Sequence, residues 1–174
     1  MRLQVRDKIV DFSDCTMVMG IININDDSFS GDGTLNQNKA MGMAMAKVDE
    51  GADIIDIGAE SARTNRGPIS VEEEINRLTP FIKTFHSARW DKDRPKPLLS
   101  VNTWRSEVSR KILPLGVDIL NDIGALSQSD NAIICSDHGT ALLIMHSIGL
   151  PKEPHLGQKY ENVIEEIKKN SKIV

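Results

Sequence analysis

A short apolar segment followed by a helical segment recurs five times along the chain, and this repeat constrains the fold more than any other feature. The apolar segments are residues 17–24, 53–57, 98–101, 119–123 and 141–145. Each is short, rich in aliphatic residues and largely without alternation between polar and apolar positions. Strands that are buried on both faces of a parallel sheet have this pattern. We therefore predict five parallel strands.

The segments between and after these strands carry helix signals. Ser70-Val71-Glu72-Glu73 has the form of a capping box, and glycine follows three of the other segments at Gly51, Gly116 and Gly139. Apolar residues recur at helical spacing within the segments. The predicted helices cover residues 36–51, the segment from Ser70 to Phe85, 104–115, 130–138 and 160–173.

Alternating strands and helices imply a parallel sheet with right-handed crossovers, either doubly wound or closed as a barrel. A doubly wound sheet that binds phosphate usually has a glycine-rich turn after its first strand. Here the first strand runs into Asn23-Ile24-Asn25-Asp26 instead. Polar residues follow every predicted strand, as in a (β/α)8 TIM barrel. We predict one barrel domain over residues 1–174 that holds five of the eight units, so that a longer chain or a partner would complete the sheet.

Composition narrows the function classes. The chain has 174 residues, 40% of them hydrophobic, and a formal net charge of −4 with no basic stripe, which argues against nucleic acid as a partner. Aromatic residues make up only 4%, so we expect an aliphatic core. Two cysteines without metal-ligand spacing fit a reducing compartment, and no apolar run is long enough to span a bilayer. We expect a cytoplasmic protein without a membrane partner.

The polar residues at the predicted strand ends indicate the chemistry. They are Asn23, Ser61, Asn102 and Asn121, with Arg63 in a loop. Side-chain amides can bond a polar heterocycle through donors and acceptors, and an arginine suits phosphate or carboxylate. An asparagine carbonyl beside aspartates suits Mg²⁺. Covalent catalysis is not favoured, because no Ser-His-Asp or Cys-His arrangement stands out.

Several motifs at these strand ends resemble the signatures of dihydropteroate synthases, in the same order along the chain. They are Met19-Gly20-Ile21-Ile22-Asn23 with Asp27-Ser28-Phe29-Ser30, the stretch 51–61 with Arg63, Ser100-Val101-Asn102-Thr103, Asn121-Asp122-Ile123 and Met145-His146. The resemblance implies a pterin-binding TIM barrel that joins a dihydropterin methyl pyrophosphate to 4-aminobenzoate in folate synthesis, releases pyrophosphate, and uses Mg²⁺. It also implies a homodimer.

The resemblance assigns roles to individual residues of this chain. Asn23 would meet Mg²⁺ and the leaving pyrophosphate, while Asn102 and Asn121 would hold the edge of the pterin ring. Ile123 and Met145 would form walls of the same pocket. The second loop would supply the substrate-binding residues Ser61, Ala62 and Arg63, with Arg63 and Asn23 as the catalytic residues.

Three departures from the family pattern leave alternatives open. Asn102 stands where the family usually has aspartate, Ala62 where it has threonine, and Asn25-Asp26 where Thr-Pro is common. The later family motifs are not found in this sequence. The first hypothesis is a synthase; the second is a pterin-binding homologue with altered catalysis. The third is a methyltetrahydrofolate-binding methyltransferase domain, whose motifs match less well.

Two carboxylates and one histidine have open roles. Asp56 lies in the middle of the second strand, where structural and functional roles are equally supported, and Glu60 at its end favours a structural role. His146 is interpreted as a hydrogen-bonded histidine at the barrel rim rather than a general base.

Overall fold

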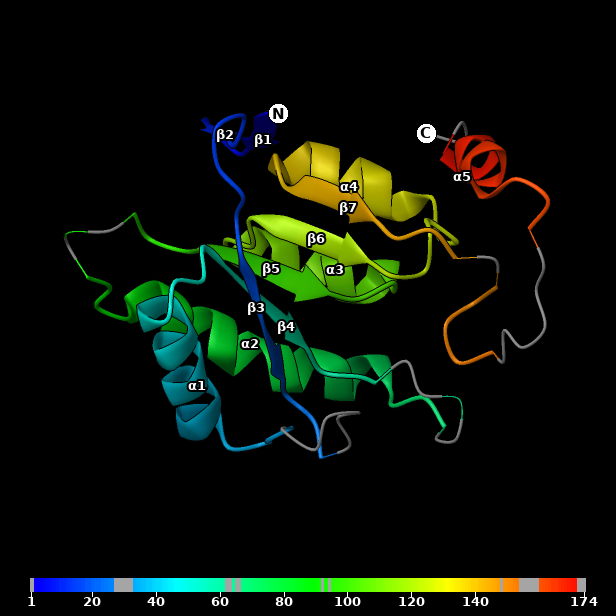
Figure 1. Cartoon of the computed structure of the whole chain (residues 1–174). Coiled ribbons are helices and arrows are strands. Elements are labelled where there is room, and N and C mark those ends of the chain that lie inside the picture. Colours follow the sequence, from blue (N-terminus) through cyan, green and yellow to red (C-terminus); the bar gives the residue numbers. More distant parts are fainter. Residues whose placement is uncertain are drawn as a thin grey trace.

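The computed structural model of the chain describes residues 2–26, 33–61, 64, 67–91, 93, 95–147, 149–153 and 160–171, with the backbone alone at 169–171. Within these residues the main feature is a five-stranded sheet (Figure 1). The strands are β3 (Met19–Asn23), β4 (Ile54–Gly58), β5 (Leu98–Asn102), β6 (Ile119–Asp122) and β7 (Ala141–Ile144). All five predicted strands are therefore confirmed, with bounds shifted by one or two residues.

The strands are parallel and lie in chain order, β3-β4-β5-β6-β7. In a doubly wound sheet the strand order reverses at a switch point, whereas in a barrel each strand pairs with the next one along the chain. The observed order is that of consecutive units of a barrel wall, as the sequence predicts.

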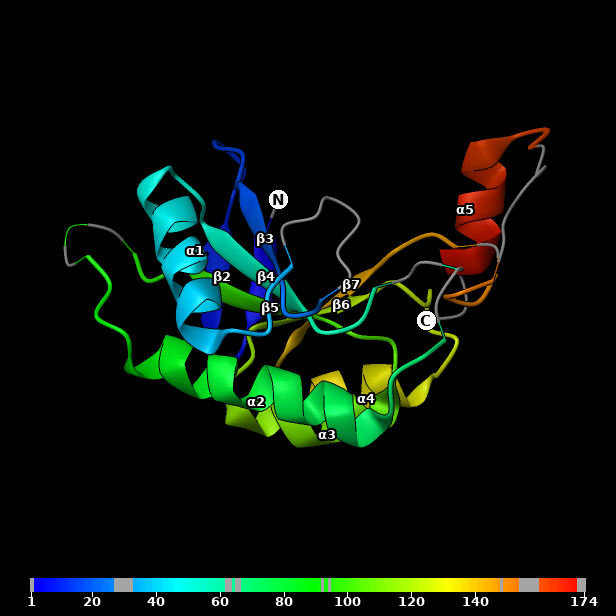
Figure 2. The ribbon, with the colours of Figure 1, turned by 90° about the horizontal axis from the view of Figure 1, so that it is seen from below.

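A helix follows each strand, and α1 to α4 cover one face of the sheet, whereas α5 stands apart from them (Figure 2). The helices are α1 (Gln37–Asp49), α2 (Val71–Ser87), α3 (Ser106–Ile112), α4 (Asp130–His138) and α5 (Val163–Ser171). The predicted caps are present, because the Ser70 hydroxyl accepts from the backbone N–H of Glu73 at 3.1 Å. Gly116 and Gly139 end their segments in the left-handed conformation that favours glycine.

The prediction of one helix over residues 104–115 is wrong in detail. Arg105 is the N-cap residue of α3, so that the helix begins only at Ser106. It gives way at residue 113 to η1 (Leu113–Leu115), a 3-10 turn that contains Pro114. Proline lacks the N–H that an α-helix needs in its interior, which explains the change.

The core lies between the sheet and helices α1 to α4. From the sheet, Ile22, Ile57, Val101 and Leu120 are completely buried. The core is mostly aliphatic, as expected, but two of the four phenylalanines are central to it. Phe81 and Phe85 of α2 are also completely buried, and their ring centroids lie 6.3 Å apart.

An N-terminal hairpin, formed by β1 (Arg2–Val5) and β2 (Lys8–Asp11), is the element that the sequence did not predict. Val5 is 1% exposed and packs in a small cluster with Ile54, Ile119 and Ala141, the first residues of β4, β6 and β7. The hairpin therefore covers the amino ends of the strands. Among the described residues, no helix is long and apolar enough to cross a membrane.

Candidate active site

Three asparagines lie side by side at the carboxyl ends of the strands. Asn23 of β3 is in register with Gly58 of β4, Gly58 with Asn102 of β5, and Asn102 with Asn121 of β6. Paired residues of parallel strands project from the same face of a sheet, so the three amides share one face. The structure thus brings together three of the residues that the sequence predicted for a common site.

This face is the one that the helices do not cover. The neighbouring row, formed by Ile22, Ile57, Val101 and Leu120, belongs to the core under helices α1 to α4. Side chains alternate between the faces of a strand, so the row of asparagines projects to the opposite side, which is the interior side of a barrel. The three amides are half-buried. They are accessible to a ligand from the carboxyl end of the sheet.

A buried carboxylate lies one layer below this row. Asp56 is 3% exposed, and its two oxygens accept from the Ser100 hydroxyl at 2.5 Å and from the Asn121 side-chain N–H at 3.3 Å. Burial raises the pKa of Asp56 above its usual value, and these two hydrogen bonds partly oppose the effect. Because Asn121 donates to Asp56, its amide is oriented by the sheet before any ligand arrives.

The two predicted wall residues also lie at the carboxyl edge, just beyond the strands. Ile123 is half-buried and follows β6, two residues after Asn121. Met145 follows β7, is 42% exposed, and its N–H donates to the carbonyl of Asp122 at 3.1 Å. Their positions beside the amide row are compatible with the predicted role, which stays a prediction.

The second loop is described only in part. Ser61 is half-buried and lines a small cavity of about 50 Å³ together with Glu60, Asn25 and Lys152. Ala62 and Arg63 lie outside the described residues, as does the motif Asp27-Ser28-Phe29-Ser30. Their predicted roles therefore stay predictions.

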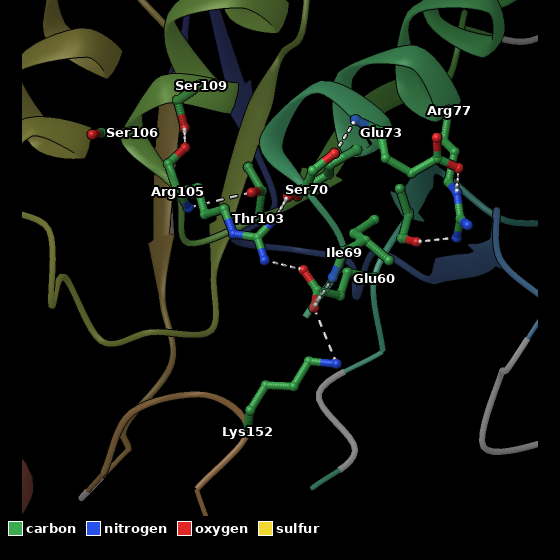
Figure 3. A network of polar contacts seen from close by, with 12 residues as sticks. Glu60, Ile69, Ser70, Glu73, Arg77, Thr103, Arg105, Ser106, Ser109 and Lys152 are labelled. Atoms are coloured by element: carbon green, nitrogen blue, oxygen red, sulfur yellow. Dashed lines mark hydrogen bonds and ion pairs between the residues drawn. The ribbon is translucent and has the colours of Figure 1, made fainter. Parts of the chain in front are cut away.

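A network of buried ion pairs lies beside Ser61 (Figure 3). Glu60 pairs with Arg105 at 2.5 Å and with Lys152 at 3.0 Å, while Arg105 also pairs with Glu74 of α2 at 2.8 Å. The side chains of Glu60 and Glu74 are 2% and 1% exposed. Burial raises the pKa of Glu74, against the opposing effects of Thr103 and Arg105. The structural role that the sequence favoured for Glu60 agrees with this position.

The sequence reasoning missed Arg105, Lys152 and Glu74. Lys152 and Glu60 lie far apart in the chain, and each follows a different strand. The only available signal was that Arg105 and Lys152 each come shortly after a strand end that carries a predicted site residue. The described residues contain no group of three His, Cys, Asp or Glu side chains that could hold a metal ion.

The fold and the amide row define a barrel-type α/β protein whose site lies at the carboxyl ends of its strands. The sequence matches the profile of a family described as "Pterin binding enzyme" over residues 19–172. The chain therefore belongs to the family of pterin-binding enzymes, which confirms the resemblance that its motifs indicate.

Relatives and solved structures agree with this assignment. The dihydropteroate synthase of Neisseria meningitidis serogroup C is 36% identical over 154 residues, which are 86% of this chain and 52% of that protein. The dihydropteroate synthase of Escherichia coli (strain K12) is 36% identical over 151 residues, 86% of this chain and 51% of that protein. This chain thus spans about half the length of these two relatives.

Among solved structures, the Yersinia pestis dihydropteroate synthase with a sulfonamide drug complex superposes with a TM-score of 0.85 at 30% identity. The match covers 99% of this chain and 60% of that one. The Coxiella burnetii dihydropteroate synthase in complex with pteroic acid gives 0.78 at 33% identity, again over 99% and 60% of the two chains. The predicted fold class, a TIM-barrel type of parallel α/β fold, is confirmed.

Proposed function

We propose that this chain provides the pterin-binding part of a dihydropteroate synthase, which joins a dihydropterin methyl pyrophosphate to 4-aminobenzoate in folate synthesis. The observation that carries the proposal is the row of Asn23, Asn102 and Asn121 on one face of the sheet. The family assignment and the relatives named dihydropteroate synthase support it.

In this reaction the amine nitrogen of 4-aminobenzoate forms a bond to the methylene carbon of the pterin. The bond from that carbon to the pyrophosphate oxygen breaks, and the amine loses a proton. Asn102 and Asn121 would bond the edge of the ring, with Ile123 and Met145 beside it. Ser61, Ala62 and Arg63 would lie near the pyrophosphate and the aminobenzoate. The protein would act mainly by positioning the substrates and by stabilising the leaving group.

Magnesium fits this site only if the substrate supplies most of its ligands. Asn23 offers one amide oxygen, and the described residues hold no cluster of acidic or histidine ligands. Mg²⁺ usually keeps several waters and binds through one or two protein groups plus substrate phosphates. We propose that Asn23 would hold such an ion, which would offset the charge of the departing pyrophosphate.

A pterin-binding homologue with altered catalysis is the second candidate, because of one specific observation. Asn102 supplies a neutral amide in the row where the family usually has a carboxylate. A neutral group stabilises a pterin cation less than a carboxylate does, whereas it can still hydrogen-bond the ring. This candidate predicts binding of the dihydropterin pyrophosphate without turnover.

Calorimetry and a coupled assay on the full-length protein test the proposal. We expect binding of the dihydropterin methyl pyrophosphate that tightens with Mg²⁺, and formation of dihydropteroate when 4-aminobenzoate is added. Asn23→Ala should remove the Mg²⁺ effect, whereas Asn38→Ala on the exposed side of α1 should not. Binding without turnover selects the second candidate, and no binding at all rejects both.

Two further features are proposed for the whole protein. We expect a homodimer located in the cytoplasm. Light scattering of the full-length protein and fractionation of the cells that make it test these two expectations.

A further inference from the structure

Glu60 connects four segments of the chain through one buried carboxylate. Its side chain follows β4, accepts from the backbone N–H of Ile69 at 3.2 Å, and pairs with Arg105 from the segment after β5. It also pairs with Lys152 from the segment after β7. Figure 3 shows Lys152 reaching Glu60 from one side while Arg105 reaches it from another. Both ends of the loop between β4 and α2 are thus tied to the same group.

The charges of this cluster balance only when Lys152 is present. Glu60 and Glu74 carry two negative charges, and Arg105 and Lys152 carry two positive ones. Removing one member of a buried ion-pair cluster leaves a charge without compensation, which is costly in a water-poor environment. The Lys152 side chain is 15% exposed, against 12% for Arg105. Lys152 is therefore an accessible member that can be altered while Arg105 keeps its two acidic partners.

Two independent features show that Lys152 is held in place. Its backbone has a φ of +74°, a conformation that L-residues with side chains rarely adopt. Its ammonium group lies 3.5 Å from the carbonyl of Gly67 as well as 3.0 Å from Glu60. Lys152 therefore contacts the loop after β4 at two points, Glu60 and Gly67, from a conformation that needs support.

We propose that Lys152 is a positioning residue, which pairs with Glu60 and thereby fixes the loop after β4 that begins with Ser61. The inference rests on the proposed function, in which Ser61 belongs to the part of the site near the pyrophosphate and the aminobenzoate. The amides that would hold the ring lie on β3, β5 and β6, away from this pair. Loss of Lys152 should therefore weaken recognition of the pyrophosphate and the aminobenzoate and leave ring binding intact.

Kinetics of Lys152→Met in the full-length protein test the proposal. We expect the KM for 4-aminobenzoate to rise about tenfold while kcat changes by less than about threefold, because only positioning is lost. In calorimetry, the dihydropterin pyrophosphate should bind more weakly, whereas the dihydropterin alcohol without pyrophosphate should bind as it does to the wild type. Lys152→Arg keeps the charge and should restore most of the affinity.

Two matched variants separate the ion pair from other effects. Lys168→Met removes an exposed lysine of α5 that pairs with Glu165, and it should leave every constant unchanged. Lys152→Gly relieves the backbone conformation but also removes the ion pair, so it should resemble Lys152→Met. If Lys152→Gly instead behaves like the wild type, the ion pair does not matter and the proposal is wrong.

Hydrogen exchange gives a readout that does not depend on turnover. In Lys152→Met, the amide of Ile69 should exchange faster, because its acceptor Glu60 is held less firmly. Amides of β4 should be unaffected. Unchanged exchange at Ile69, or an active wild type whose KM values match those of Lys152→Met, overturns the positioning role alone. A wild type that does not bind the dihydropterin pyrophosphate overturns the proposed function, and with it the assignment of Lys152 to this reaction.

Discussion

Asn23 and Asn102 lie at the same level of the sheet with one strand between them, and that strand carries a glycine at this level. Gly58 is in register with both residues. A Cβ atom at position 58 would lie 3.6 Å from the Cβ of Asn102. Without it, the surface between the two amides is flat backbone. This arrangement leaves space for a planar ring between polar groups that can bond its edge.

Replacing Asn102 with aspartate tests the departure from the family pattern. Asn102→Asp places a negative charge beside the proposed cation, so we expect kcat to rise about tenfold, which corresponds to ~1.4 kcal/mol of transition-state stabilisation. Steady-state assays of dihydropteroate formation by the full-length protein measure this. Asn38→Asp on the exposed side of α1 is the control for added charge. If rate and binding both stay as in the wild type, Asn102 does not face the ring.

Replacing Asp56 with asparagine should change how stability depends on pH. The folded-state pKa of Asp56 is raised above 3.8, so its favourable contribution is fully present below pH 3.8 and is lost as pH rises through the raised pKa. In that window the wild type should lose up to about 1.4 kcal/mol per pH unit from this group. Asp56→Asn should remove this part of the slope.

Urea unfolding of both proteins at pH values from 4 to 7 measures the difference, with pH steps of about one unit. Glu74 and Asp122 also have raised pKa values and contribute a similar slope in both proteins. The comparison therefore isolates Asp56. Parallel curves for the two proteins would show that its carboxyl group has the same pKa in the folded and unfolded states.

The two cysteines should differ strongly in reactivity. Burial raises the pKa of the Cys135 thiol to about 12, so the reactive thiolate is scarce, whereas Cys15 is exposed. Iodoacetamide at mildly alkaline pH should modify Cys15 alone in the native protein and both residues in urea. Mass spectrometry of the peptides identifies the sites, with Cys15→Ser as the control. Modification of Cys135 at the same rate as Cys15 would contradict its buried position.

Arg6 should stabilise the fold without affecting the site. Its guanidinium group donates to the carbonyls of Leu113 at 2.9 Å and Val117 at 3.0 Å, which joins the hairpin to the segment before β6. Arg6→Leu should lower the free energy of unfolding by about 1–3 kcal/mol, because it leaves these carbonyls without their donor. Urea unfolding measures the loss, and exposed Lys8→Leu is the control.

The same Arg6→Leu protein should keep its affinity for the dihydropterin pyrophosphate in calorimetry. The hairpin covers the amino ends of the strands, and the row of asparagines lies at their carboxyl ends. A weaker affinity at a temperature where the variant is fully folded would show that the two ends of the sheet are coupled.

The strands and the amide row could be predicted from sequence because both depend on local patterns. Buried parallel strands have a recognisable composition, and their carboxyl ends must meet at one edge, so Asn102 and Asn121 had to be neighbours. The hairpin could not be predicted, since its four-residue strands are mostly exposed and its support comes from distant residues such as Ile119. The pair of Glu60 and Lys152 joins residues far apart in the chain, and no local pattern reveals such a contact.

The order of the strands has a consequence for how the molecule forms. Each strand of the sheet pairs with the strand that precedes it along the chain, so the sheet can grow in step with synthesis from the amino terminus. The hairpin is the exception, because the N–H of Arg6 donates to the carbonyl of Gly139, just before β7. The first segment to leave the ribosome must therefore wait until β6 and α4 have been made before its own contacts are complete.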